Sequence, residues 1–186
     1  MNDCDRNKAI TLLKKHTKNS NLLKHMLAVE SAMRIYAKKF NKNPDWWGVV
    51  GLLHDFDYEK YPDPKDHPAK GAEILRHEGY SDEFIKTILA HASHAGEPRD
   101  TLAKKTIFAV DELCGFVIAV TLVRPNKSLS EVKVKSVKKK MKDKAFARQV
   151  NRDEIIKGAE ELNVPLDEHI GNVLTALQSI SQELNL

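Results

Sequence analysis

Residues 22–36 read LLKHMLAVESAMRIY, and this stretch carries the pattern that decides the fold. Its apolar residues recur mostly at steps of three and four, as an amphipathic helix requires. The same period dominates the rest of the chain, and no sustained alternation of β-branched residues indicates a strand. The sequence therefore predicts an all-α fold, with helices at about 5–17, 20–40, 44–55, 68–78, 82–93, 101–123, 129–147, 152–162 and 166–184.

Residues that break helices fall between these segments. Pro62, Pro64 and Pro68 mark a loop, and Pro125 ends the long apolar helix. No linker, internal repeat or low-complexity tract divides the chain. We therefore expect a single compact domain of eight or nine helices over residues 1–186, with a core at about 20–123 and a basic helical part at about 127–186.

Composition excludes several classes of protein. Hydrophobic residues make up 41% of the chain and charged residues 30%, which is typical of a soluble globular protein. Cys4 and Cys114 stand far apart in the sequence, which excludes a disulfide scaffold and a cysteine-based zinc site. The most apolar stretch, residues 108–123, contains Asp111 and Glu112 and so does not predict a membrane span. With no apolar run at the start of the sequence, we expect a cytoplasmic protein without a membrane partner.

Positive charge is concentrated between Lys127 and Arg152, a segment that holds ten basic and two acidic residues. Such a segment indicates either an anionic partner or a solvated, lysine-rich helix face. Phe146 is the only aromatic residue in it, so the base-stacking side chains of a single-strand binder are missing. A nucleic-acid partner is therefore not favoured, and the sequence does not predict an oligomeric state.

Ionisable residues occur on the apolar faces of four predicted helices: His25, His54, His91 and Asp111. One such histidine alone is usually a hydrogen-bonded core residue, whereas a buried aspartate is costly unless it is paired or bound to a cation. Imidazole and carboxylate together suit Fe, Mn, Co, Ni or Zn. Asp55, next to His54 at a helix end, can reach the same ion, and His67 lies between this pair and the helix of His91. The pattern therefore favours a metal site if these residues converge.

The ordered set His25, His54-Asp55 and Asp111 resembles the H…HD…D signature of the HD-domain superfamily of metal-dependent phosphohydrolases. His67 and His91 resemble the additional histidines of its two-metal members. The segments HDFDYEKYP, HPAKGAEIL, AVDEL, LVRP and SVKKKMKDKAFA look like a prokaryotic group of predicted HD-superfamily hydrolases. The resemblance covers the chain from Leu22 to its C-terminus.

This resemblance implies a helical core that binds one or two divalent transition metals. By matching positions, the first ion would be held by His25, His54, Asp55 and Asp111. The second would be held by Asp55, His67 and His91.

The chain departs from the family pattern at two places. Ala92 stands where some two-metal relatives have a further histidine, and His94 could replace that ligand. Many HD enzymes continue after the HD pair with Gly-Lys, whereas this chain has Phe56-Asp57. Any role of that lysine would therefore pass to Lys60 or Lys70.

The function implied by the resemblance is hydrolysis of a nucleotide or other small phosphate ester by metal-activated water, with Asp55 as the catalytic residue. Because the basic segment follows the helix of Asp111, we expect Arg124, Lys138 and Lys139 to contact the substrate phosphate. Two alternatives stay open. Some HD-fold proteins are di-iron oxygenases that cleave C–C or C–P bonds, and the basic segment would also suit a non-enzymatic module that binds an anion or nucleic acid.

Two acidic residues follow the HD pair in the predicted loop. Asp57 and Glu59 are candidates for proton acceptors or for groups that support the ligands. Acidic residues in a loop are more often simply solvated. We therefore expect both to lie in solvent.

Overall fold

The computed structural model describes residues 3–186, which form ten α-helices and two short 3-10 helices, with no strand among them. The predicted all-α fold is confirmed. None of these helices combines the length and the apolar character that crossing a membrane requires. The helices are α1 (Arg6–His16), α2 (Ser20–Lys39), α3 (Pro44–Leu53), α4 (Ala69–His77), α5 (Asp82–Leu89), η1 (Ser93–Ala95), α6 (Leu102–Leu122), η2 (Leu129–Glu131), α7 (Val134–Met141), α8 (Arg152–Glu161), α9 (Leu166–Ser179) and α10 (Ser181–Leu184).

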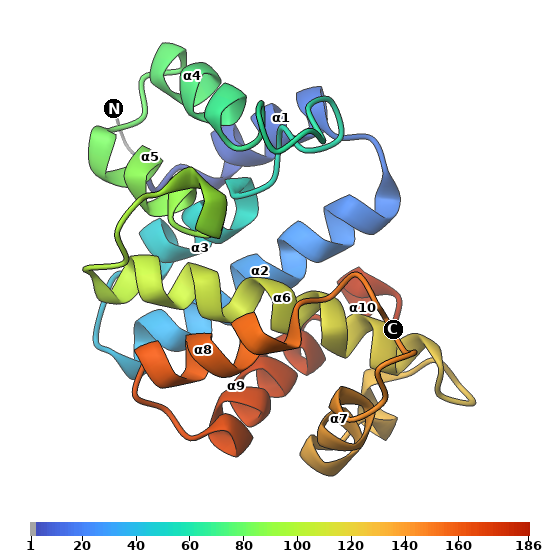
Figure 1. Ribbon diagram of the computed structural model, residues 1–186. Coiled ribbons are helices and arrows are strands. Elements are labelled where there is room, and N and C mark those ends of the chain that lie inside the picture. Colours follow the sequence, from blue (N-terminus) through green and yellow to red (C-terminus); the bar gives the residue numbers. More distant parts are fainter. Residues whose placement is uncertain (1–2) are drawn as a thin grey trace.

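Two long helices, α2 and α6, pack against each other at the centre of the molecule (Figure 1). Helix α3 packs on α2, α8 packs on α6, and α9 contacts both central helices. Helices α4 and α5 pack together at one end of the molecule, whereas α7 lies at the opposite end (Figure 1). One cluster of buried apolar side chains extends from Ala9 to Leu184 and includes Val137 of α7 and Ile155 of α8.

Polar caps fix where the helices of the central layer begin. The side chain of Asn19 accepts hydrogen bonds from the backbone N–H groups of Asn21 and Leu22 at the start of α2. Asn43 caps α3 in the same way, with Pro44 at the first helical position. Thr101 caps α6. Because an uncapped helix start leaves its backbone donors unpaired, these side chains set the boundaries.

Two glycines allow the central helices to approach their neighbours closely. A Cβ atom on Gly51 of α3 would lie 2.9 Å from the Val29 carbonyl oxygen of α2. A Cβ atom on Gly158 of α8 would lie 2.5 Å from the Cα atom of Ala109 in α6. Real Cβ atoms essentially never come so close to backbone atoms. Glycine is therefore what permits the spacing of both helix pairs.

The basic segment departs from the prediction of one helix over 129–147. It forms η2, then the extended and buried Val132, then α7, and it continues as an irregular loop from Lys142 to Asn151. Val132 enters the core, which interrupts a continuous helix there. After α7, the backbone N–H of Ala145 donates to the side chain of Asp143, and Ala147 adopts a positive φ. These local contacts replace helical ones and end the helix early.

Candidate metal centre

The structure brings the six predicted ligands together from helices distant in sequence. Helices α2 and α6 contribute one ligand each from their interiors, and the others stand where helices end or begin. In chain order they are His25 on α2, His54 at the end of α3, Asp55 in the turn after it, His67 just before α4, His91 just after α5 and Asp111 on α6. Helix ends leave side chains free to turn inward, which explains why four ligands stand there.

The first group of donors surrounds Asp111. Its Oδ1 atom lies 2.9 Å from His25 Nε2 and 3.4 Å from His54 Nε2. The Nε2 atom of His54 is also 3.5 Å from Asp55 Oδ2. The His54 side chain is fully buried, whereas those of His25 and Asp111 are 18% and 19% exposed. The group therefore has a buried side formed by His54 and a side accessible to solvent at His25 and Asp111.

The second group of donors surrounds the other oxygen of Asp55. Its Oδ1 atom lies 3.2 Å from His67 Nε2 and 3.1 Å from His91 Nε2. The donor atoms of this group lie within 4.8 Å of one another, as do those of His25, His54 and Asp55. The two oxygens of Asp55 therefore face different groups, and one carboxylate belongs to both.

Three of the histidines are oriented by hydrogen bonds from the ring nitrogen that faces away from the cluster. Nδ1 of His54 donates to the Gly51 carbonyl at 2.8 Å, and Nδ1 of His91 donates to the Ile88 carbonyl at 2.7 Å. Nδ1 of His67 donates to Asp57 Oδ1 at 2.9 Å. Such bonds place the proton on Nδ1 and leave the lone pair of Nε2 directed inward, as in metal-bound histidines.

This arrangement fits a cation. Nε2 of His67 and Nε2 of His91 lie 3.2 Å apart, and with both Nδ1 atoms protonated each presents a lone pair to the other. That contact is repulsive unless a cation or a proton lies between them. Nε2 of His54 and Oδ1 of Asp55 are buried and form no hydrogen bond within residues 3–186. Buried polar atoms without partners are costly, and a metal ion would satisfy them.

The pKa values reflect the same concentration of charge. Burial lowers the pKa of His54, but the charges of Asp55 and Asp111 outweigh burial and raise the pKa to about 9. Burial also lowers the pKa of His67, and its interactions with the Asp55 and Asp57 carboxylates raise the pKa to about 9. Burial raises the pKa values of both Asp55 and Asp111, yet the adjacent histidines hold them below the usual range. The carboxylates are therefore ionised, and protons on His54 and His67 balance their charge until a metal ion displaces those protons.

Asp57 is not solvated, so our expectation for it was wrong. It is fully buried, and its Oδ2 accepts the backbone N–H of Gly71 at 2.8 Å while Oδ1 accepts His67 Nδ1. A Cβ atom on Gly71 would lie 2.8 Å from this carboxylate. Asp57 thus fixes the ring of His67 against the start of α4. Glu59, in contrast, is exposed and accepts the backbone N–H groups of Lys18 and Asn19.

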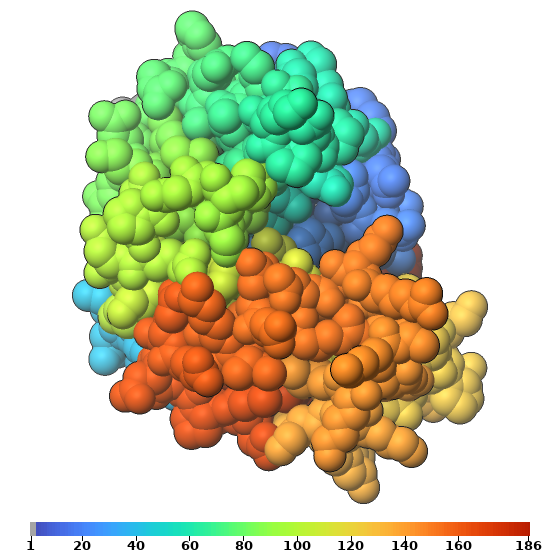
Figure 2. Space-filling model, in the orientation of Figure 1, coloured from blue at the N-terminus to red at the C-terminus, as the bar shows by residue number. Residues whose placement is uncertain are grey.

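The cluster lies at the floor of a cavity of about 650 Å³. Figure 2 shows the hollow between the teal and green segments above and the orange segment below, with yellow α6 at its floor. Residues that sequence reasoning did not assign complete its walls: Tyr58, Ala92, Ser93, Glu112, Gly115, Gln149 and Glu154. Most of them are individually unremarkable in sequence.

Glu112 is the wall residue with the clearest sequence signal, because it directly follows Asp111. Its Oε2 atom accepts the backbone N–H of Asn151 at 3.2 Å. Burial and the charge of Asp111 raise its pKa to about 7. A carboxyl group with this pKa exchanges a proton near neutral pH.

The structure does not bring the predicted cationic contacts to this cavity. Arg124, Lys138 and Lys139 are absent from its lining, and Lys138 Nζ lies 2.5 Å from Asp167 Oδ1 of α9. Sequence proximity to Asp111 misled the prediction, because the chain leaves the far end of the 21-residue helix α6 before it enters the basic segment.

The proposed substitutes for missing family residues are engaged in other contacts. His94 lines the cavity, but its Nε2 donates to the His67 carbonyl at 2.9 Å. Lys70 pairs with Glu73, and Lys60 lies over the ring of Tyr61. The described ligand groups therefore contain neither His94 nor a lysine.

Comparison with known proteins supports the identification at the level of the family. No curated protein and no solved structure matches the chain. The family model of the HD domain matches residues 22–115, just over half of the chain, and this range holds all six predicted ligands. The chain belongs to the HD-domain family.

Proposed function

We propose that the protein is a metal-dependent phosphohydrolase that acts on a nucleotide or another small phosphate ester. The observation that carries the proposal is the position of Asp55, which shares its two oxygens between two donor groups at the floor of an open cavity. The HD-domain family consists mostly of metal-dependent phosphohydrolases. A cavity of about 650 Å³ also has the size of a small-molecule site.

Different residues of the chain would bind the metal, orient its ligands and transfer a proton. A divalent metal bound by the two groups supplies a Lewis acid for a phosphoryl oxygen and lowers the pKa of a bound water. His54 and His91 are held by backbone carbonyls, and His67 is held by Asp57, so their Nε2 atoms stay aimed without rearrangement. Glu112, in the cavity wall, is placed to hold or release a proton near the reacting phosphate.

A phosphate-release screen tests the proposal. The protein is loaded with Mn²⁺, Co²⁺, Ni²⁺ or Zn²⁺ and incubated with a panel of phosphorylated metabolites. We expect phosphate release that needs metal and is lost in His54→Ala. His77→Ala is the matched control, because His77 is exposed at the end of α4 and outside the cavity. Absence of phosphate release with every metal would contradict the proposal.

The same donor groups also suit iron, so a di-iron oxygenase is the second candidate. The two functions differ in what the protein consumes. If the iron-loaded protein takes up O₂ and releases no phosphate, the oxygenase proposal would replace the hydrolase proposal.

A further inference from the structure

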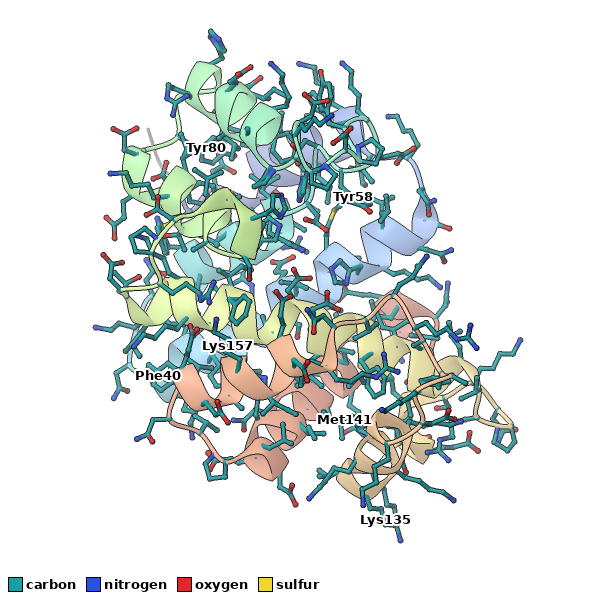
Figure 3. The ribbon with its side chains drawn as sticks, in the orientation of Figure 1. Phe40, Tyr58, Tyr80, Lys135, Met141 and Lys157 are labelled. Atoms are coloured by element: carbon teal, nitrogen blue, oxygen red, sulfur yellow. The ribbon has the colours of Figure 1, made fainter. Side chains whose placement is uncertain are left out.

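A second hollow of about 570 Å³ adjoins the metal cavity, and Gln149 lines both. It is built from the end of α7, the loop over residues 142–151 and the start of α8. Its apolar lining comes from Met141, Val150 and Ile156, and Ile156 is 40% exposed. In Figure 3, Tyr58, which lines the metal cavity, lies in the upper part of the molecule, and Met141, the last residue of α7, lies in the lower part.

The charged groups of this second hollow are mostly positive and largely free. Lys144 and Arg148 line it, and neither side chain forms an ion pair or hydrogen bond with any other residue in 3–186. Asp153 is the only acidic residue in the lining. An anion in this hollow would therefore meet two cations that have no competing partner.

The loop that carries these cations is held in place by Arg152. Its guanidinium donates to the carbonyls of Ala147 and Val150, both at 2.7 Å, and to that of Phe146. The same guanidinium lies over the ring of Phe116 on α6. Arg152 therefore stabilises the loop, whereas Lys144 and Arg148 remain available to bind an anion.

The loop is also tied to the metal cluster. The backbone N–H of Asn151 donates to Glu112, the neighbour of Asp111. Gln149 stands between the two hollows. A ligand could therefore occupy both, with one end at the metal cluster and the other beside Lys144 and Arg148.

We propose that the second hollow binds a second anionic group of the substrate, so that the substrate class is phosphate esters whose alcohol part carries another negative charge. The inference rests on the proposed hydrolase function, which places the phosphate ester of the substrate at the metal cluster. The apolar lining would contact the carbon skeleton between the two anionic groups. In this placement, Lys144 and Arg148 bind the second anionic group, and Gln149 lies along the substrate between the two hollows.

Linear probes test the inference by measuring both affinity and span. Alkane-α,ω-diol bisphosphates of four to ten carbons are compared with alkyl monophosphates of equal length, in calorimetric titrations of the Mn²⁺-loaded protein. We expect one length of bisphosphate to bind about 10–100-fold more tightly than its monophosphate, as charge-assisted hydrogen bonds predict. In Lys144→Ala/Arg148→Ala this preference should vanish while monophosphate binding stays unchanged. The charge reversal Lys144→Glu/Arg148→Glu should make the bisphosphate the weaker ligand.

A charge-matched double variant is the control. Lys38→Ala/Lys135→Ala removes two exposed lysines outside both hollows, and Lys135 points to solvent at the foot of the molecule in Figure 3. It should keep the preference for the bisphosphate. Equal affinity for both probe classes in the parent protein, no binding of either class, or a preference that survives Lys144→Ala/Arg148→Ala would overturn the inference.

Phosphate release from the same probes separates the two proposals. If phosphate is released from monophosphates and bisphosphates alike and the protein shows no preference in affinity, the inference about the second hollow is contradicted and the hydrolase proposal is supported. A preference for bisphosphates without release of phosphate under any metal would support the second hollow and contradict the hydrolase.

Discussion

The Asp55 carboxylate is the residue on which the site depends most. Its Oδ1 contacts His67 and His91, and its Oδ2 faces His54. No other residue belongs to both ligand groups that the described chain contains. Replacing any one histidine removes a donor from one group, whereas replacing Asp55 removes a donor from both.

Asp57 orients His67 from outside the predicted ligand set. In Asp57→Asn, the amide keeps one oxygen but turns the other position into a donor. Either His67 Nδ1–H or the Gly71 N–H then loses its acceptor. We expect Mn²⁺ affinity, measured by calorimetry, to fall by about 10–100-fold while the fold is kept.

Glu59→Gln is the control for this prediction. Glu59 is exposed and serves only the start of α2. Its variant should bind Mn²⁺ as the parent does. Parent-like affinity in Asp57→Asn would show that His67 needs no orienting carboxylate.

The sequence was informative about ligands and misleading about their surroundings. His25 and Asp111 could be singled out because polar groups on apolar helix faces need a partner. The role of Asp57 depends on how residues 58–70 turn back, and no local pattern encodes that path. Lys138 is oriented by Asp167, which lies 29 residues further along the chain.

At the scale of helices, the period of the apolar residues predicted most elements. The prediction from this period was wrong in the basic segment for two reasons. Val132 is buried in an extended conformation. The guanidinium of Arg152 donates to carbonyl groups of the loop over residues 142–151 and so stabilises it. The predicted helix over 44–55 also ends earlier, at Leu53, which frees Asp55 to face both ligand groups. Contacts between distant residues override local preference at these places.

The contact between α6 and α8 depends on Gly158. In Gly158→Ala, the new Cβ would lie 2.5 Å from Ala109 Cα, so α8 must move away from α6. We expect urea unfolding to show a loss of about 1–3 kcal/mol in the free energy of unfolding.

Gly171→Ala is the opposite case on α9. Its Cβ would meet only Val134 Cγ2, at an ordinary 4.0 Å. Because alanine favours a helix interior over glycine, this variant should gain about 0.5–1 kcal/mol. A Gly158→Ala protein that is as stable as the parent would show that α6 and α8 can separate at no cost.

At the scale of the whole molecule, His169 connects three helices through the core. It is fully buried on α9, its Nδ1 accepts the hydroxyl of Tyr36 from α2 at 2.5 Å, and its Nε2 donates to the Ala109 carbonyl of α6 at 2.9 Å. The bond from Tyr36 needs the neutral ring, because a protonated Nδ1 has no lone pair to accept it. Burial lowers the pKa of His169 to about 4.

This histidine makes stability depend on pH. Between about pH 6.5 and pH 4 the unfolded chain binds a proton at residue 169 that the folded chain does not, so acid favours unfolding. The stabilisation is complete above about pH 6.5, and about 3 kcal/mol of it is lost by about pH 4. Urea unfolding at a series of pH values measures this loss.

His169→Gln isolates the contribution. Glutamine offers an N–H for the Ala109 carbonyl but has no group that titrates in this range. The difference in the free energy of unfolding between parent and variant should shrink as pH falls from 6.5 to 4. A difference that stays constant over this range would mean that the pKa of His169 is the same in the folded and unfolded protein.

The central claim is that the His and Asp cluster holds a metal, and the metal content of protein purified without chelator tests it most directly. Asp111→Asn keeps the volume of the side chain but removes the charge that faces His25 and His54. We predict that the parent and the exposed-site control His77→Ala carry divalent transition metal in stoichiometric amount. Asp111→Asn should remain folded and lose it. Equal metal content in the parent and in folded Asp111→Asn would contradict the account.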